Sequence, residues 1–259
     1  MKKDSRIYSG PLVSVVIPTY NGSKLIGRAV ESVYSQTFKN FEIVIVNDGS
    51  EDNTLNIISN LKARVIDNKK NLGFVKSLNI GIENSTGKYI ARLDDDDIWI
   101  DSEKLGKQVR FMEENQDCVL SGGGIIKTDG RKEISRHLFP ESDKDIRKKI
   151  LVSNLFNHSA AMFKKKDWQE TGRYDEEFGF FADYDLWLKL GGRGVFYNFQ
   201  EYFVNYLDKE ALGNYEERNR KIRRKLKLVI KLRNKHRKNY PGFIKSLGYC
   251  FSSYLYSYL

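Results

Sequence analysis

The sequence predicts an α/β protein with a mostly parallel, doubly wound sheet and a helical extension at its C-terminus. Short β-branched runs alternate with segments of helical periodicity, which is the pattern of βαβ units. The first run, Leu12–Ile17, is almost entirely apolar, as expected for a strand that is buried on both faces. Polar residues follow the early strands, at the edge where open α/β sheets bind their ligands.

Each element is expected from a local pattern. β-Branched and apolar runs predict strands at residues 12–17, 41–46, 64–67, 88–93, 160–163 and 195–204. Apolar residues three or four apart predict helices at residues 23–34, 74–83 and 183–190, and two more that run through Leu61 and Met112. Ser121–Gly124 and Thr128–Lys132 are expected to be loop or hairpin. The C-terminal extension predicts two helices, which are separated at Pro241 and Gly242.

The composition is that of a packed globular protein. Of the 259 residues, 40% are hydrophobic and 13% are aromatic, which is ample for a core. Cys118 and Cys250 lie far apart, which fits a reducing compartment and argues against a disulfide framework. The first ten residues contain no apolar stretch, and no run approaches 18 apolar residues. We therefore expect a cytoplasmic protein with neither a signal peptide nor a membrane-spanning helix.

The basic excess belongs to one segment. The formal net charge is +10, from 44 Lys and Arg residues against 34 Asp and Glu residues. Twelve of the basic residues lie between Arg218 and Lys238, a stretch without any acidic residue. The rest of the chain therefore holds 32 basic and 34 acidic residues and is nearly neutral.

Four consecutive aspartates, Asp94–Asp97, follow the predicted strand that ends at Leu93. Their mutual repulsion is unfavourable unless positive charge lies between the carboxylates. In an extended segment, residues two apart share a face, so Asp94 and Asp96 would point the same way. Such a pair suits Mg²⁺ or Mn²⁺, which often use one or two protein carboxylates and complete their shells with substrate phosphates and water. The alternative is a solvated acidic turn that also caps the next helix.

Four motifs resemble, in order and spacing, those of the inverting family 2 glycosyltransferases with the GT-A fold. The motifs are VSVVIPTYNG from Val13, SVYSQTFKNFEIVIVNDGSEDNT from Ser32, NLGFVKSLNIGIENSTGKYIARLDDDD from Asn71 and GRYDEEFGFFADYDLWLKL from Gly172. The resemblance covers roughly residues 12–205. It implies a nucleotide-sugar-binding domain over residues 1–212, with a donor-binding half of about 1–100 and an acceptor-binding half of about 101–212. Residues 213–259 form the C-terminal extension.

The resemblance implies a donor site formed by Pro18, Tyr20, Asn21, Asp48, Asn79, Arg92, Asp94 and Asp95. Asp48 matches the acid that contacts the base, which is commonly uracil. Asp96 matches the direct ligand of Mg²⁺ or Mn²⁺ in the family's DXD motif. His158 matches a position that often faces the diphosphate or the metal, although a lone histidine is commonly structural.

Asp183 matches the family's catalytic base. A sugar hydroxyl is a weak nucleophile, so a carboxylate must accept its proton during attack. A divalent metal offsets the charge that develops on the leaving diphosphate. These roles imply in-line transfer with inversion from a nucleotide sugar, expected to be a UDP-sugar. The alternative for Asp183 is a helix N-cap, because it precedes an apolar periodic run.

The enzyme implied by the resemblance is a hexosyl- or N-acetylhexosaminyltransferase of polysaccharide biosynthesis, acting on a glycan or a polyprenyl-linked acceptor. A nucleotidyltransferase is the enzymatic alternative, but it would need a glycine-rich phosphate loop with a basic residue, which IPTYNGSKL lacks. A catalytically silent nucleotide-sugar-binding module is the other alternative. It is suggested by Asn47 and Ala182, which stand where the family usually has acids.

The C-terminal extension combines cations with apolar residues. Ile222, Leu226, Val229 and Ile230 recur at helical spacing in the basic segment, and tyrosines are frequent between residues 249 and 258. A basic amphipathic helix next to tyrosines suits an anionic membrane surface, so we expect peripheral membrane association. The alternative is that the apolar stripe packs on the catalytic domain. Binding of nucleic acid is least expected, because no known motif accompanies the basic run. The sequence does not indicate an oligomeric state.

Overall fold

The computed structural model describes residues 10–208 and 215–248, without the side chains of residues 215–225. Its centre is a nine-stranded sheet with the order β3-β2-β1-β4-β8-β6-β9-β5, and β7 pairs with β6 off this path. The strands are β1 (Val13–Thr19), β2 (Phe41–Asn47), β3 (Arg64–Asp67), β4 (Tyr89–Arg92), β5 (Ile98–Trp99), β6 (Cys118–Thr128), β7 (Glu133–His137), β8 (Met162–Lys164) and β9 (Val195–Leu207).

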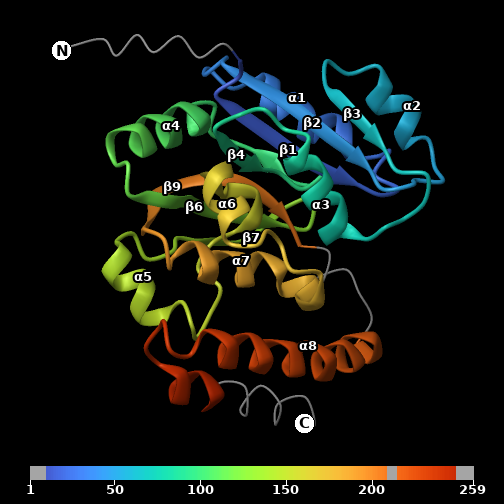
Figure 1. Cartoon of the computed structure of the whole chain (residues 1–259). Coiled ribbons are helices and arrows are strands. Elements are labelled where there is room, and N and C mark those ends of the chain that lie inside the picture. Colours follow the sequence, from blue (N-terminus) through green and yellow to red (C-terminus); the bar gives the residue numbers. More distant parts are fainter. Residues whose placement is uncertain (1–9, 209–214, 249–259) are drawn as a thin grey trace.

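Helices cover both faces of this sheet (Figure 1). They are α1 (Ile26–Tyr34), α2 (Thr54–Ser59), α3 (Phe74–Glu83), α4 (Lys104–Glu114), α5 (Asp143–Lys149), α6 (Lys165–Glu170), α7 (Ala182–Leu190) and α8 (Tyr215–His236), with 3-10 helices η1 (His158–Ala160) and η2 (Glu176–Phe181). The predicted α/β class, the two-sided cover of helices and the helical C-terminal extension are therefore confirmed.

The first half of the sheet is parallel, as predicted. β1 pairs in parallel with both β2 and β4, and β2 pairs in parallel with β3. Every residue of β1 is buried, because alternate side chains serve the two faces. Val15 and Ile17 lie in the hydrophobic cluster that contains α1, whereas Val16 lies in the cluster that contains Leu78 of α3.

Beyond β4 the sheet becomes mixed. β8 pairs antiparallel with β4 and with β6, and β5 pairs antiparallel with β9. β6 and β9 are parallel partners over most of their length. β8 therefore joins the parallel half to the mixed half, and the loop that precedes it lies next to the end of β4.

The expected loop at Ser121–Gly124 is wrong, because these residues lie inside the long strand β6. Their glycines leave room for side chains of the neighbouring strand β9. A Cβ atom on Gly123 would lie 2.3 Å from the ring of Phe203, and one on Gly122 would lie 2.4 Å from Oδ1 of Asn198. Residues 129–132 do form the hairpin turn between β6 and β7, as predicted.

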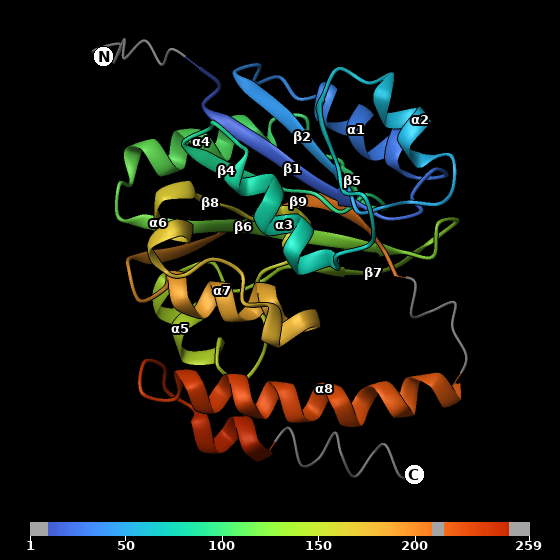
Figure 2. The same ribbon diagram turned by 45° about the vertical axis from the view of Figure 1, so that its right-hand side comes forward.

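The described part of the C-terminal extension packs on the domain. α8 runs beneath α7 in both ribbon views (Figures 1 and 2), and residues 243–248 form the expected second helix. Leu232 and Tyr240 are buried in the same cluster as α7, and Val229 packs against it. The tyrosines from residue 249 onward lie outside the described residues. In the described part of the chain, no helix combines the length and apolar character needed to cross a bilayer.

Candidate active site

The first expected site residues lie at the carboxyl end of β1. Pro18 is buried within β1, and Tyr20 and Asn21 follow it in an exposed loop. The N–H of Asn21 donates to Oγ of Ser50, and Oδ1 of Asn21 accepts from the N–H of Glu51, each at 2.9 Å. The loop after β1 is therefore tied to the loop after β2.

Asp48 is buried and holds the loop that enters α3. Its Oδ1 accepts from the N–H of Leu72 at 2.8 Å and from Nδ2 of Asn68 at 3.0 Å. Its Oδ2 accepts from the N–H of Gly73 at 2.9 Å. Asp48 thus holds the backbone around residues 71–73 in place, and Asn71 in this segment lines the cavity described next.

An open cavity of about 400 Å³ lies between the loops after β2 and β3. Its lining is mainly polar and includes Asn47, Ser50, Asp67 and Asn68. Nδ2 of Asn47 donates to Oδ1 of Asp67 at 2.7 Å. A carboxylate at position 47 would instead repel Asp67, so the amide found there fits its neighbour better than the acid usual in the resembled family.

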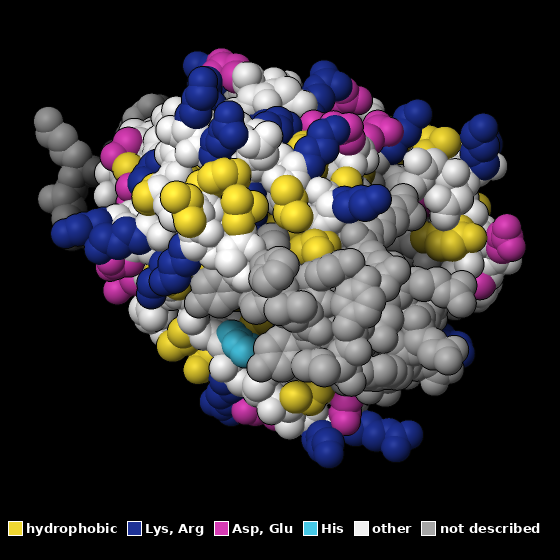
Figure 3. All heavy atoms as spheres, turned by 90° about the horizontal axis from the view of Figure 1, so that it is seen from below, with side chains coloured by type: hydrophobic (Ala, Val, Ile, Leu, Met, Phe, Trp, Pro, Cys, Tyr) yellow, Lys and Arg dark blue, Asp and Glu magenta, His cyan; other side chains and the backbone are white. Residues whose placement is uncertain are grey.

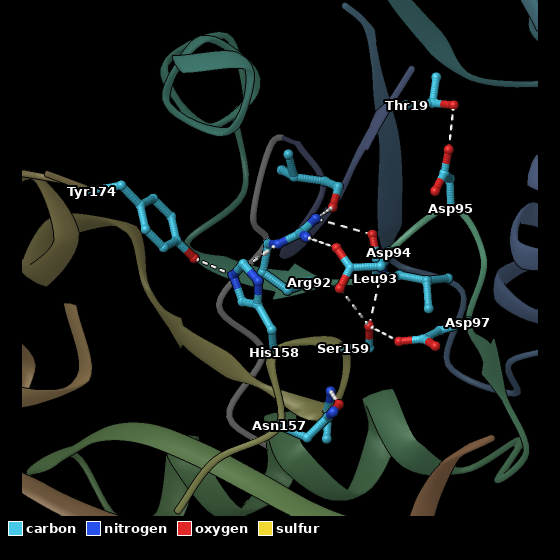
Figure 4. A network of polar contacts seen from close by, with 12 residues as sticks. Thr19, Arg92, Leu93, Asp94, Asp95, Asp97, Asn157, His158, Ser159 and Tyr174 are labelled. Atoms are coloured by element: carbon cyan, nitrogen blue, oxygen red, sulfur yellow. Dashed lines mark hydrogen bonds and ion pairs between the residues drawn. The ribbon is translucent and has the colours of Figure 1, made fainter. Parts of the chain in front are cut away.

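Arg92 is fully buried at the end of β4 and organises a polar network (Figure 4). Its guanidinium donates to Oδ1 of Asp94 at 2.6 Å and to the carbonyls of Val16 and Leu93. Its Nε donates to Nε2 of His158 at 3.1 Å. Because a buried charge is costly without a partner, the ion pair with Asp94 fixes that carboxylate at the edge of the sheet.

His158 is part of this buried network. Its Nε2 also lies 2.7 Å from the hydroxyl of Tyr174. Burial and the charge of Arg92 lower the pKa of His158 well below its usual value, so the imidazole is neutral. In this structure Nε2 of His158 is therefore engaged by protein groups.

Hydrogen bonds from neighbouring residues hold three of the four aspartates, Asp94, Asp95 and Asp97. Asp94 faces Arg92, and its N–H donates to Oγ of Ser159 at 3.0 Å. Asp95 accepts from the hydroxyl of Thr19 at 2.5 Å. Asp97 is buried and accepts from Oγ of Ser159 at 2.5 Å. The alternative that this run caps the next helix is wrong, because α4 begins at Lys104 with Glu103 at its N-cap. Asp95 and Asp96 do lie in a turn and are half-buried.

The electrostatics of this cluster favour a cation. Burial raises the pKa of Asp94 against the opposing effect of Arg92, and the charge of Asp96 raises it further. Burial and the charges of Asp94 and Asp96 raise the pKa of Asp97 well above its usual value. In the described residues, no three His, Cys, Asp or Glu side chains form a metal-holding group. The residues fit a divalent ion that takes one or two carboxylates and completes its shell from the substrate.

Asp183 is the second residue of α7 and is partly buried. Its Oδ2 accepts from Nδ2 of Asn154 at 2.9 Å. Burial raises the pKa of Asp183 to about 6, against hydrogen bonds from Tyr184 and Asn154, and the charge of Asp94 adds to the rise. The N-cap alternative is wrong, because Phe181 occupies that position. Asp183 and Asp94 are within electrostatic reach of each other.

The sequence did not single out the residues that join these parts. Ser159 binds two of the aspartates, and Tyr174 contacts His158. Asn79, expected at the donor, pairs with the main chain of Tyr174 through both ends of its amide, at 3.0 and 3.2 Å. A local signal for the turn that carries Ser159 is Asn157, whose Oδ1 accepts from the N–H of Ala160.

Comparisons with known proteins show which sequences this chain is similar to. Residues 14–171 match the model of the family described as Glycosyl transferase family 2. The chain is 31% identical over 216 residues to an uncharacterized glycosyltransferase of Haemophilus influenzae, covering 76% of the chain and 65% of that protein. It is 34% identical over 192 residues to the amylovoran biosynthesis glycosyltransferase AmsE of Erwinia amylovora, covering 71% of each. Some other relatives are matched over as little as 20% of their length.

Solved structures share the fold at lower identity. A crystal structure of S. aureus TarS 1-349 in complex with UDP has a TM-score of 0.67 at 21% identity, covering 88% of this chain and 66% of that one. The mannosyltransferase PcManGT from Pyrobaculum calidifontis, in complex with GDP-Man and Mn²⁺, has a TM-score of 0.71 at 17% identity. The match covers 96% of this chain and 72% of that one.

Proposed function

The chain belongs to glycosyl transferase family 2, and from this premise we propose an inverting, metal-dependent enzyme that transfers a sugar from a UDP-sugar to a hydroxyl group. The acceptor that we propose is a glycan or a polyprenyl-linked sugar of polysaccharide biosynthesis. The observation that carries the proposal is the pair of carboxylates at one site. Burial raises the pKa of Asp183 to about 6, and the charge of Asp94 adds to this rise.

On the donor side, the nucleoside would lie across the loops after β1, β2 and β3. These loops carry Tyr20, Asn21 and the polar cavity beside Asn47 and Asp67. The UDP complex of TarS, which shares the fold, supports a nucleoside diphosphate as the leaving group. Asp48 would act mainly by holding the loop around residue 72, because its two oxygens already accept three hydrogen bonds.

The metal ligand that we propose is Asp96. A divalent ion bound there would offset the negative charge of the leaving diphosphate as a Lewis acid. The Mn²⁺ in the PcManGT complex supports this class of cofactor. Asp94 would face the donor while it stays paired with Arg92. A contact between His158 and the metal stays a prediction, and it would require Nε2 to leave Arg92 and Tyr174.

Asp183 would accept the proton of the attacking hydroxyl. A general base works best when its pKa lies near the working pH, and a pKa of about 6 meets that condition while the carboxylate stays ionised at pH 7. Attack from the side of Asp183, with departure toward Asp94 and Asp96, would invert the anomeric centre in one step. The chain needs no second nucleophile for this chemistry.

Ligand binding tests this proposal against its alternatives. We would measure thermal shifts with UDP, GDP, UDP-glucose and UDP-N-acetylglucosamine, each with Mn²⁺ or with EDTA. A ligand at a hundred times its Kd stabilises the folded state by about 2.7 kcal/mol. We expect uridine ligands to stabilise most, and only with Mn²⁺. Release of UDP from a stabilising sugar donor would then exclude a silent binding module, whereas equal shifts with EDTA would contradict a metal-dependent site.

We also propose that the enzyme associates with an anionic, cytoplasmic membrane surface. The packing of α8 does not conflict with this, because only one side of the helix faces the domain. Its other side exposes Lys227 and Ile230, Lys238 is exposed just beyond its end, and Ile244 in the following helix is 85% exposed. Figure 3 shows Lys and Arg side chains around hydrophobic ones on this face. Each cation near an anionic leaflet contributes about 1 kcal/mol.

A further inference from the structure

The turn of α7 that carries Asp183 lacks a side-chain cap. Phe181 stands at the N-cap and makes no capping hydrogen bond. Just before it, Gly179 has a φ of +49°, a conformation that residues other than glycine rarely adopt. η2 runs directly into α7 here, and the N–H of Tyr184 in the first turn donates to Oδ1 of Asp183 itself at 2.6 Å. Asn154 holds the carboxylate of Asp183 at 2.9 Å, and the turn that carries it is braced by further contacts from outside α7.

Helix α8 supplies such contacts on the opposite side of this turn. Residues two apart on a helix point about 200° apart, so Asp185 points away from Asp183. Asp185 is fully buried, and its Oδ1 lies 2.9 Å from both Nε2 of His236 and Nζ of Lys235. Burial alone would raise the pKa of Asp185, but the bond from His236 and the charges of Lys189 and Lys235 lower it to about 2.

Lys235 links the two ends of the segment that leads to Asp183. Its Nζ lies 3.2 Å from Oδ2 of Asp175, the N-cap residue of η2, and 2.9 Å from Asp185 in α7. Between these carboxylates, the same ammonium group lies 4.6 Å from the ring centre of the buried Phe178. One side chain of α8 thus spans Gly179 and the uncapped start of α7. Without Lys235, Asp185 would keep His236 at 2.9 Å and Lys189 at 3.0 Å, so the specific loss is the link from Asp185 to Asp175 and Phe178.

Other contacts hold α8 in place without Lys235. Arg233 donates to the carbonyl of Ser246 at 2.6 Å and to the carbonyl of Val152. The hydroxyl of Tyr240 donates to the carbonyl of Leu188 at 2.8 Å, and Leu232 is fully buried. Removal of the Lys235 side chain should therefore loosen the start of α7 while α8 stays docked.

We propose that α8 is a positioning element for the acceptor-side carboxylate, with Lys235 as the positioning residue that fixes the first turn of α7 from behind. This inference rests on the proposed role of Asp183 as the base. In this role Lys235 would act through its contacts with Asp175, Phe178 and Asp185.

Hydrogen exchange of the full-length chain tests the positioning directly. The variant is Lys235→Ala, and the matched control is Lys227→Ala, which removes the same charge from an exposed position of α8. We expect amides 182–186 to exchange about tenfold faster in Lys235→Ala, because local opening becomes easier. Strands β1 and β2 should be unchanged, and Lys235→Arg should restore protection. Equal exchange in the Lys235→Ala and Lys227→Ala variants, or faster exchange throughout the chain, would overturn the proposal.

Kinetics separate this inference from the proposed function. In membrane-free assays of UDP release from UDP-N-acetylglucosamine with Mn²⁺, Lys235→Ala should lower kcat about tenfold and leave the donor KM unchanged. The rising limb of its pH profile should move to lower pH. A loosened turn would expose Asp183 to water, and this exposure would lower the pKa of its carboxyl group. If Asp183→Asn keeps the parental rate, the base assignment fails, while the exchange data still decide whether Lys235 positions α7. If Asp183→Asn is inactive and Lys235→Ala behaves like the control, only the positioning role fails.

Discussion

Replacement of Asp183 by asparagine should stabilise the fold at neutral pH while it removes the proposed base. The folded protein resists ionisation of this carboxyl group, because burial and the charge of Asp94 raise its pKa from 3.8 to about 6. Below pH 3.8 the group is protonated in both the folded and the unfolded chain. As pH rises from 3.8 to 6, the unfolded chain ionises first, so this stabilising contribution is lost. Asparagine cannot ionise and does not show this loss.

The pKa difference sets the magnitude. A difference of about 2.2 units between folded and unfolded chain corresponds to about 3 kcal/mol at pH values above 7. At pH 4.5, where the unfolded chain is mostly ionised and the folded chain is not, the same two pKa values give about 1 kcal/mol. The advantage of Asp183→Asn over the parent in free energy of unfolding should therefore grow by about 2 kcal/mol between pH 4.5 and 7.5.

Urea unfolding in EDTA, followed by tryptophan fluorescence, measures this difference without any knowledge of the substrate. The same variant should slow sugar transfer about 10²- to 10⁴-fold, the usual contribution of a general base, with little change in donor affinity. A difference in unfolding free energy that stays constant from pH 4.5 to 7.5 would refute the burial argument. Parallel losses of donor binding and turnover would indicate a structural role for Asp183.

Three further outcomes are expected. Asp96→Ala should abolish Mn²⁺-dependent binding of UDP in calorimetry with an unchanged circular dichroism spectrum, and parental binding would remove Asp96 as the ligand. Gly123→Ala should destabilise the protein by about 1–3 kcal/mol in urea unfolding, because the new methyl group would meet the ring of Phe203 at 2.3 Å. Lys238→Glu combined with Ile244→Ser should reduce co-sedimentation with anionic vesicles at low salt and leave UDP binding intact, and identical partitioning of variant and parent would contradict membrane binding by this face.

Local patterns predicted most of the fold. The strand at residues 64–67 and the helix at 74–83 have the predicted bounds, because apolar periodicity and turn residues define them within a few positions. Ser121–Gly124 shows where such patterns fail. Consecutive glycines suggest a loop. They suit a strand here because the side chains of Asn198 and Phe203, more than 70 residues later, occupy the space next to them.

The sequence indicated the charged residues of the site but not the contacts that join them. The run Asp94–Asp97 and Asp183 stand out by residue type, whereas Ser159 and Tyr174 are ordinary residues that become important through packing. The C-terminal extension shows the same limit. Its cations indicated a charged surface, but no spacing reveals that Lys235 reaches a buried carboxylate 50 residues earlier.

The hydrogen bond from the N–H of Leu207 to Oδ1 of Asp97 joins residues 110 positions apart, at 3.0 Å. A ribosome adds about 5–20 residues per second, so the aspartate run leaves the exit tunnel several seconds before its last partner. Until then, Asp97 has the bond from Ser159 but lacks the one from Leu207 that completes its position. A nascent chain arrested before Leu207 should therefore contain the parallel strands without a finished nucleotide site. Nucleotide affinity would then report that synthesis and folding of the whole sheet are complete.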